Sequence, residues 1–107
     1  MYELSRHRFA ELKHYCMQYD EWQRLYLSYE DQSLPPPETA IPKTAYLQAM
    51  QLIETTAMDT DAALGRYILR SVTHDVSTRA LNPPCDSKSF DFYRRKFFWL
   101  LSERKGV

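Results

Sequence analysis

The chain has 107 residues and a mass of 12.7 kDa, enough for one domain with a single hydrophobic core. Its 14 basic and 14 acidic side chains cancel, and only two residues are glycine, so composition indicates neither a strongly basic module nor a β-rich fold with many tight turns. No apolar run reaches the ~20 residues of a membrane-spanning helix, and the first residues lack the apolar core of a signal peptide, so we expect a cytoplasmic protein without a membrane partner.

Two helices are predicted at the start of the chain. Apolar residues recur there at spacings of three and four, and the Ser5 hydroxyl is placed to cap the first helix. A break is expected at residues 18–20, because Asp20 and Gln23 resemble a capping box. The alternative is one continuous helix, in which Tyr15 and Tyr19 extend the apolar stripe of the second segment. The expected bounds are residues 5–17 and 21–30, within an N-terminal helical hairpin of residues 1–31.

A proline-rich linker is predicted over residues 32–43. Its three consecutive prolines, Pro35–Pro37, lack backbone donors and favour an extended conformation. Apolar residues in the 3.6-residue period then predict two further helices, and Gly65 is expected to weaken the first turns of the second. The expected bounds of these two helices are residues 44–58 and 59–74.

A short helix and a long one close the chain. Ser77 can cap a helix over residues 78–81, which an Asn-Pro-Pro turn ends. Asp86 or Ser87 is the expected N-cap of the last helix, which runs to about residue 104. Because no alternating strand pattern occurs, the expected fold class is all-α: one domain over the whole chain, built as a small bundle of five to six helices.

The last helix has two different faces. At about 100° per residue, one side forms an apolar stripe that we expect in the core: Phe90, Tyr93, Phe97, Leu100 and Leu101, with Arg104. The opposite side combines cations with two large rings: Lys88, Phe92, Arg95 and Trp99, with Ser102. Three explanations of that second face stay open. It is enclosed by its own domain, it pairs with a second copy or another protein, or it faces nucleic acid.

The short helix, the turn and the long helix together have the layout of a helix-turn-helix, whose second helix lies in the major groove. Residues 55–107 carry nine basic and six acidic side chains, so this half of the chain is positive. A helical hairpin without a DNA-binding role is the alternative. The candidate base-reading residues are Ser87, Lys88, Ser89, Asp91 and Phe92. The candidate phosphate or partner contacts are Arg79, Arg94, Arg95, Lys96 and Trp99.

The sequence contains no pattern typical of an enzyme or a metal site. Cys16 and Cys85 lie far apart, and in a cytosolic chain we expect both to be reduced and packed as small apolar groups. The histidines His7, His14 and His74 lack partner ligands at metal-binding spacing. No glycine-rich phosphate loop and no HExxH motif is present. We therefore expect no catalytic residue, no metal and no cofactor.

Three segments carry a family resemblance: LSRHRFAELKHYCMQYDEW, LIETTA and PCDSKSFDFYRRKFFWLLSERK. They resemble small helix-turn-helix proteins of phages and prophages of low-GC Gram-positive bacteria, akin to ArpU/RinA-type regulators of phage late genes and to sigma-factor region-four domains. The resemblance covers most of the chain and implies a bacterial host cell. It differs at STRALNPP, which is shorter than the scaffold helix of such proteins and leaves room for a relative with a protein target.

Three functions follow as expectations. The first is a phage-encoded transcriptional regulator that binds duplex DNA through the helix-turn-helix-like unit. The alternative is an inhibitor that binds a host protein, such as an anti-CRISPR acting on a defence complex or a factor acting on the host polymerase. A DNA-packaging role, like that of a small terminase subunit, is the third. A homodimer fits each of them, because it would bury the face that holds Phe92 and Trp99.

Overall fold

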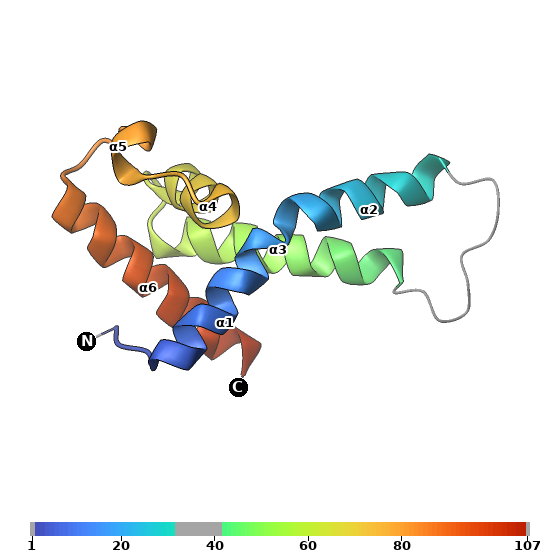
Figure 1. The fold of residues 1–107 in the computed structure, drawn as a ribbon, viewed down its shortest axis with the longest axis horizontal. Helices are drawn as coiled ribbons and strands as arrows, with labels where there is room; N and C mark the ends of the chain where they lie inside the picture. The colour runs from blue at the N-terminus through green and yellow to red at the C-terminus, as the bar shows by residue number, and fades with distance from the viewer. Residues whose placement is uncertain (1, 32–41, 107) are drawn as a thin grey trace.

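The computed structural model describes residues 2–31 and 42–106. These ranges are all-α and contain no strand, which confirms the predicted fold class. Five helices have ten residues or more, and one helix is a single turn (Figure 1). The helices are α1 (Arg6–Met17), α2 (Tyr19–Asp31), α3 (Lys43–Thr60), α4 (Gly65–His74), α5 (Thr78–Leu81) and α6 (Ser87–Lys105).

The core lies where α1, α3, α4 and α6 meet. The predicted apolar stripe of α6 supplies three fully buried side chains, Phe90, Phe97 and Leu101. Phe98 is equally buried, although the sequence did not place it in that stripe. It packs edge-on against Phe9 of α1 at a ring-centroid distance of 5.0 Å. The last helix is therefore enclosed on two sides, by α3 and by α1.

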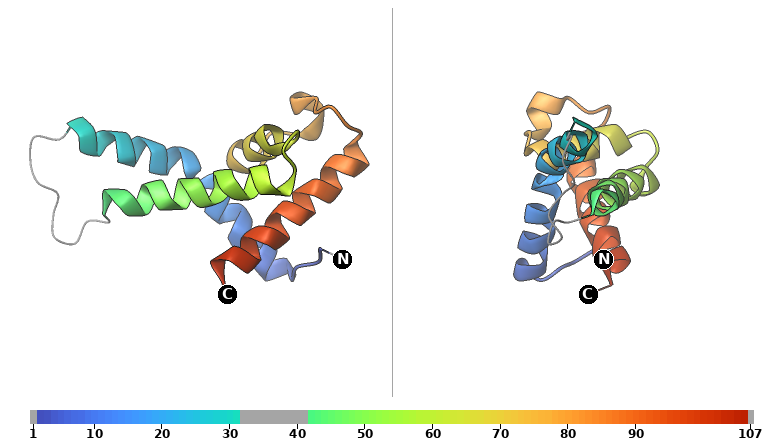
Figure 2. Two further views of the ribbon diagram at one scale, coloured as in Figure 1. Left: turned by 180° about the vertical axis from the view of Figure 1, so that it is seen from behind. Right: turned by 90° about the vertical axis from the view of Figure 1, so that its right-hand side faces the viewer.

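The predicted N-terminal hairpin does not form. α1 ends at Gln18, and α2 leads away from α1 and lies along α3 instead (Figures 1 and 2). The predicted break at residues 18–20 is present at Gln18, but the capping box is not. Asp20 lies within the first turn of α2, and its carboxylate pairs with Nε2 of His74 at 2.9 Å. A tertiary partner therefore outcompetes the local cap.

Most of the predicted proline-rich linker, residues 32–43, lies outside the described residues. Its last two residues are described: Pro42 occupies the N-cap position of α3, and Lys43 is the first residue of that helix. The helix then continues to Thr60, two residues beyond its predicted end.

Three predicted N-caps are confirmed. The side chains of Ser5, Ser77 and Asp86 each accept a hydrogen bond from the backbone N–H three residues later, at 3.1, 3.2 and 3.2 Å. Such a bond satisfies one of the helix's unpaired N–H groups and contributes about 1 kcal/mol. The starts of α1, α5 and α6 are thus fixed by residues that the sequence identifies.

Gly65 has a structural role that its helix propensity does not indicate. α4 begins at this residue, later than predicted, because Asp61 holds a turn by accepting hydrogen bonds from the backbone N–H groups of residues 63 and 64. A Cβ atom at position 65 would lie 3.1 Å from the Cα of Met58 and 3.3 Å from the carbonyl oxygen of Ala57. Glycine therefore permits the close approach of α3 and α4.

Gly65→Ala is expected to lower the free energy of unfolding by about 1–3 kcal/mol, although alanine is the better helix former. The added methyl group meets the side-chain sulfur of Met58 and also the backbone of α3, which cannot move without separating the two helices. Urea denaturation followed by circular dichroism measures the change. The double variant with Met58→Ala should recover only the side-chain part of the loss, and an increase in stability for Gly65→Ala alone would contradict the close approach.

Candidate nucleic-acid interface

Residues 77–105 hold the predicted helix-turn-helix-like unit, called here the C-terminal unit. Asn82 ends α5 in the left-handed conformation, with φ of 50°, and its backbone N–H donates to the carbonyl oxygen of Thr78 at 3.0 Å. Asparagine tolerates this conformation better than most residues. Pro83 and Pro84 follow, and Asp86 starts the next helix. The turn between α5 and α6 is therefore specified by local residues (Figure 1).

The candidate base-reading residues lie in the first two turns of α6. Ser87, Lys88, Asp91 and Phe92 are exposed, whereas Ser89 is half-buried. Hydrogen bonds from Ser89 hold the pKa of the Asp86 carboxyl below its usual range. This carboxylate already occupies one amide at the helix start, so a phosphate there would meet a negative charge. The exposed side chains, rather than the helix terminus, are the groups available to a partner.

The candidate phosphate contacts lie on both helices of the C-terminal unit. Arg79 on α5 and Arg95 on α6 are exposed, and Arg94 and Lys96 are half-buried. Nε of Arg95 donates to the carbonyl oxygen of Asp91 at 3.5 Å, a contact within its own helix. Nε of Arg94 is buried and has no hydrogen-bond partner. No described acidic side chain forms an ion pair with any of the four.

Two of the six acids in the second half of the chain form ion pairs with cations outside the predicted contact residues. Asp59 pairs with Arg104, and Asp75 pairs with Lys13 of α1 at 3.8 Å. Lys105 lies over the ring of Tyr15, 3.6 Å from its centroid. Within the described ranges, eight cations of residues 55–107 form no ion pair, against four acids that form none. Lys105 is one of the eight and is engaged with the Tyr15 ring. We call the other seven the unpaired cations: Arg66, Arg70, Arg79, Lys88, Arg94, Arg95 and Lys96.

The aromatic face of α6 is partly covered by the chain's own N-terminal segment. The ring of Tyr2 meets Phe92 edge-on at 5.5 Å and Trp99 edge-on at 5.3 Å between centroids. Trp99 is half-buried, while Phe92 remains 42% exposed. The first of the three explanations, enclosure within the domain, therefore holds in part for Trp99, whose ring is half-buried against Tyr2. Phe92 stays accessible to a partner.

Tyr2→Ala is expected to expose Trp99 and to lower the free energy of unfolding by about 0.5–1.5 kcal/mol, since two edge-on ring contacts are lost. The emission of Trp99, recorded in a Trp22→Phe background, should shift to longer wavelength. Glu3→Ala, one residue away and exposed, is the matched control and should leave the emission unchanged. An unshifted spectrum for Tyr2→Ala would show that Tyr2 does not cover Trp99.

Two hollows beside this face involve α1, which the sequence did not place here. One has a volume of about 500 Å³ and the other about 340 Å³, and Phe9, Arg95 and Phe98 line both. The first also reaches Tyr2 and the Arg6 side chain. The contact between residues 9 and 98 joins the two ends of the chain, so no local sequence pattern could reveal it.

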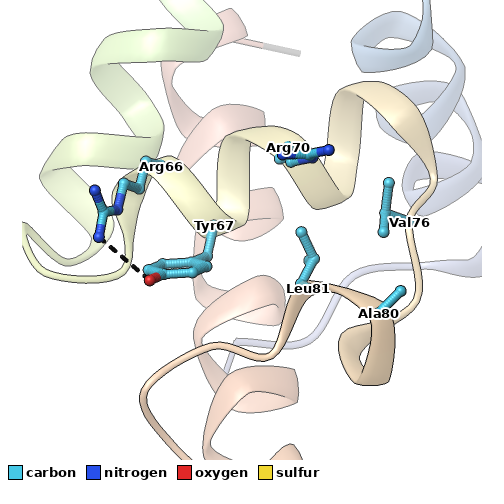
Figure 3. Close-up of a pocket in the computed structure, with 6 residues that line it drawn as sticks. All are labelled: Arg66, Tyr67, Arg70, Val76, Ala80 and Leu81. Carbon is cyan, nitrogen blue, oxygen red and sulfur yellow. Dashed lines mark hydrogen bonds between the residues drawn. The ribbon is translucent and has the colours of Figure 1, made fainter.

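A further hollow, of about 480 Å³, lies between α4 and α5 (Figure 3). Arg66 donates from Nη2 to the Tyr67 hydroxyl at 3.2 Å, and its guanidinium lies over the Tyr67 ring at 5.0 Å. Arg66 and Arg70, spaced by one helical turn, were not among the predicted site residues. The hollow is lined by Arg66, Tyr67, Arg70, Val76, Ala80 and Leu81.

Residues 2–31 and 42–106 contain neither a metal-binding cluster nor a membrane-spanning helix. No group of three or more His, Cys, Asp or Glu side chains is placed there to hold a metal ion. No described helix is both long and apolar enough to cross a membrane. Both cysteines are free thiols, and Cys16 is buried in the core.

Comparison with known proteins adds no family to this picture. No protein-family model, no curated protein and no solved structure matches the chain significantly. The function is therefore inferred from the unpaired cations, the exposed start of α6 and the ring cluster around Phe92.

Proposed function

We propose that this chain is a phage-encoded transcriptional regulator that binds duplex DNA through α5 and α6. The observation that carries the proposal is the five unpaired cations of the C-terminal unit, four of which lie on α6 and one on α5. Cations without acidic partners are free to bind phosphates and to release the counterions of DNA. The neutral net charge does not oppose this, because the negative excess belongs to residues 1–54.

The start of α6 supports the same proposal. Lys88 and Phe92 are exposed one turn apart, and Ser87 and Asp91 lie beside them. Lysine and serine hydrogen-bond base edges in the major groove, and an aromatic ring contacts a thymine methyl group. Arg79 on α5 is placed before the turn, as expected for a phosphate contact that sets the orientation of the second helix.

Fluorescence anisotropy with a labelled random-sequence duplex tests the proposal. At low salt the chain should bind, and each of Lys88→Ala and Arg95→Ala should weaken binding and make the salt slope shallower by about one unit. Arg24→Ala, an exposed arginine on α2, is the control and should bind as the parent chain does. Absence of duplex binding at low salt would exclude the proposal.

A protein-binding inhibitor is the second candidate, and the exposure of Phe92 favours it. Phe92 lies beside Tyr2 and Trp99, and Arg95 lines the adjoining hollow of about 500 Å³. Aromatic residues and arginine are enriched at the centres of protein interfaces. Under this candidate, Phe92→Ala removes the interaction with a host defence or polymerase protein, and duplex binding is absent.

A DNA-packaging protein would use the same cations, so the location of its binding site on the phage genome distinguishes it from a regulator. A homodimer is proposed for either role, since two copies of α6 would match two half-sites of a palindromic operator. Sedimentation at high protein concentration measures the mass, and a monomer there would exclude the dimer.

A further inference from the structure

The hollow between α4 and α5 has a chemistry that duplex binding by α6 does not use. Its charged part comes from Arg66 and Arg70, which lie one turn apart on α4, and neither forms an ion pair with any described acid. Its apolar part comes from Val76, Ala80 and Leu81, on the turn and on α5 (Figure 3). No carboxylate is among the lining residues.

The ring of Tyr67 links the two parts. It lies at the side of the hollow, and its hydroxyl accepts a hydrogen bond from Arg66 at 3.2 Å (Figure 3). This bond holds one guanidinium in place, so that arginine loses less conformational freedom when an anion arrives. Arg70 has no hydrogen bond to any described residue, and its donors are available to a carboxylate or a phosphoryl group.

The same two arginines border a second hollow, of about 370 Å³, toward the end of α4. It is lined by Tyr19, Leu69, Thr73, His74 and Val76 in addition to Arg66 and Arg70. Two carboxylates contact residues that line this hollow: Asp20 is engaged with Nε2 of His74 at 2.9 Å, and Glu54 accepts a hydrogen bond from the Tyr19 hydroxyl at 2.9 Å. The positive charge of Arg66 and Arg70 therefore lies between two hollows that are both partly apolar.

The hollow stays open because α5 is only one turn long. That turn contributes one large apolar side chain, Leu81, to the contact with α4, and Ala80 contributes only a methyl group. A volume of about 480 Å³ falls in the range of small-molecule sites, which are mostly apolar with a few polar groups that fix the ligand's orientation.

We propose that the α4–α5 hollow binds a small organic anion with an aromatic or apolar body. Arg70 holds the carboxylate or phosphoryl group, Arg66 adds positive charge from the other side of the Tyr67 ring, and the body packs against Val76, Leu81 and that ring (Figure 3). A DNA backbone phosphate would satisfy the arginines but would leave the apolar wall without a partner. The ligand therefore differs in class from the DNA proposed above, and the site does not depend on that proposal.

Phenyl phosphate is a suitable probe because it joins both features in one small molecule. Titration into the isotope-labelled chain, followed by amide chemical shifts, should move the signals of residues 66–70 and 76–81. Inorganic phosphate and phenol each offer one feature, and both should bind about tenfold more weakly or less. Equal affinity for inorganic phosphate would show that the apolar wall contributes nothing, and the proposal would be wrong.

Two variants separate the site from general charge effects. Arg70→Gln should weaken phenyl phosphate binding by about tenfold, whereas Arg24→Gln on α2 should not change it. Ala80→Leu fills the hollow without altering charge, so it should abolish the phenyl phosphate shifts while the spectrum stays folded. Retained binding in Ala80→Leu would overturn the proposal.

A random-sequence duplex provides the last arm of the experiment. If the duplex moves the same signals and displaces phenyl phosphate, the two arginines belong to a DNA surface and the small-anion site is excluded. If the duplex binds and leaves residues 66–70 and 76–81 unchanged while phenyl phosphate shifts them, the site is independent of DNA. If the duplex does not bind, the proposal of DNA binding is excluded, and the phenyl phosphate titration still tests the small-anion site. The two proposals can therefore be excluded independently.

Discussion

Phe97→Ala is expected to lower the free energy of unfolding by about 3–5 kcal/mol. Phe97 is fully buried on α6 and meets the ring of Phe98 at 5.1 Å between centroids. Truncation removes the transfer free energy of a whole ring and leaves a cavity that the surrounding helices fill only in part, because their packing against each other limits how far they can move inward. Because domains of this size are stable by roughly 5–15 kcal/mol, the variant should be close to unfolding at 37 °C.

Phe92→Ala is the matched control, since it makes the same change on the same helix. Phe92 is 42% exposed, and its contacts are with the neighbouring Tyr2 and Tyr93 rings. Its loss of stability should therefore be well below that of Phe97→Ala. Thermal and urea denaturation followed by circular dichroism measure both variants. Equal losses for the two would contradict the assignment of the buried face of α6.

The features that the sequence predicted correctly are those fixed within a few residues. The caps at Ser5, Ser77 and Asp86 depend on a side chain and an amide three positions apart. The buried stripe of α6 follows from helical periodicity, which places Phe90 and Phe97 on one side. These signals need no information about the rest of the chain.

The features that the sequence did not predict depend on distant partners. Phe98 is buried because Phe9 of α1 covers it, and α2 follows α3 partly because the Tyr19 hydroxyl donates to Glu54 at 2.9 Å. Gly65 was expected to weaken a helix, whereas it allows two helices to touch. In the candidate site, the sequence identified the basic residues of α5 and α6 as possible phosphate contacts. It could not show that they form no ion pairs, because that depends on where the folded chain places its acidic side chains.

The structural role of α6 and its proposed role in DNA binding can be separated by experiment, because the residues concerned lie on different sides of the helix. Its buried residues hold the fold, while Lys88 and Arg95 are exposed and form no ion pair with a described residue. Exposed substitutions away from caps and ion pairs change stability by roughly 0.5 kcal/mol or less. A loss of DNA binding in Lys88→Ala or Arg95→Ala would therefore report on binding rather than on folding.

The chain is expected to lose stability steeply in alkaline solution, and Cys16 is the main cause. Burial raises the pKa of its thiol from 9.0 to about 12, against the opposing influence of Lys105. Above pH 9 the unfolded chain releases the thiol proton, while the folded chain keeps it. The unfolded state then binds fewer protons, so the free energy of unfolding falls as pH rises. Between these two pKa values the loss reaches about 4 kcal/mol.

Two tyrosines act in the same direction at slightly higher pH. Burial raises the pKa of Tyr15, and burial together with the hydrogen bond to Glu54 raises the pKa of Tyr19 to about 12. Urea denaturation from about pH 8 to pH 11 measures the combined slope. Cys16→Ala loses some packing energy at every pH, so the two proteins are compared by the slope of the free energy of unfolding against pH. This slope should be much shallower for Cys16→Ala than for the parent chain. Parallel curves for the two proteins would show that the buried thiol does not govern alkaline unfolding.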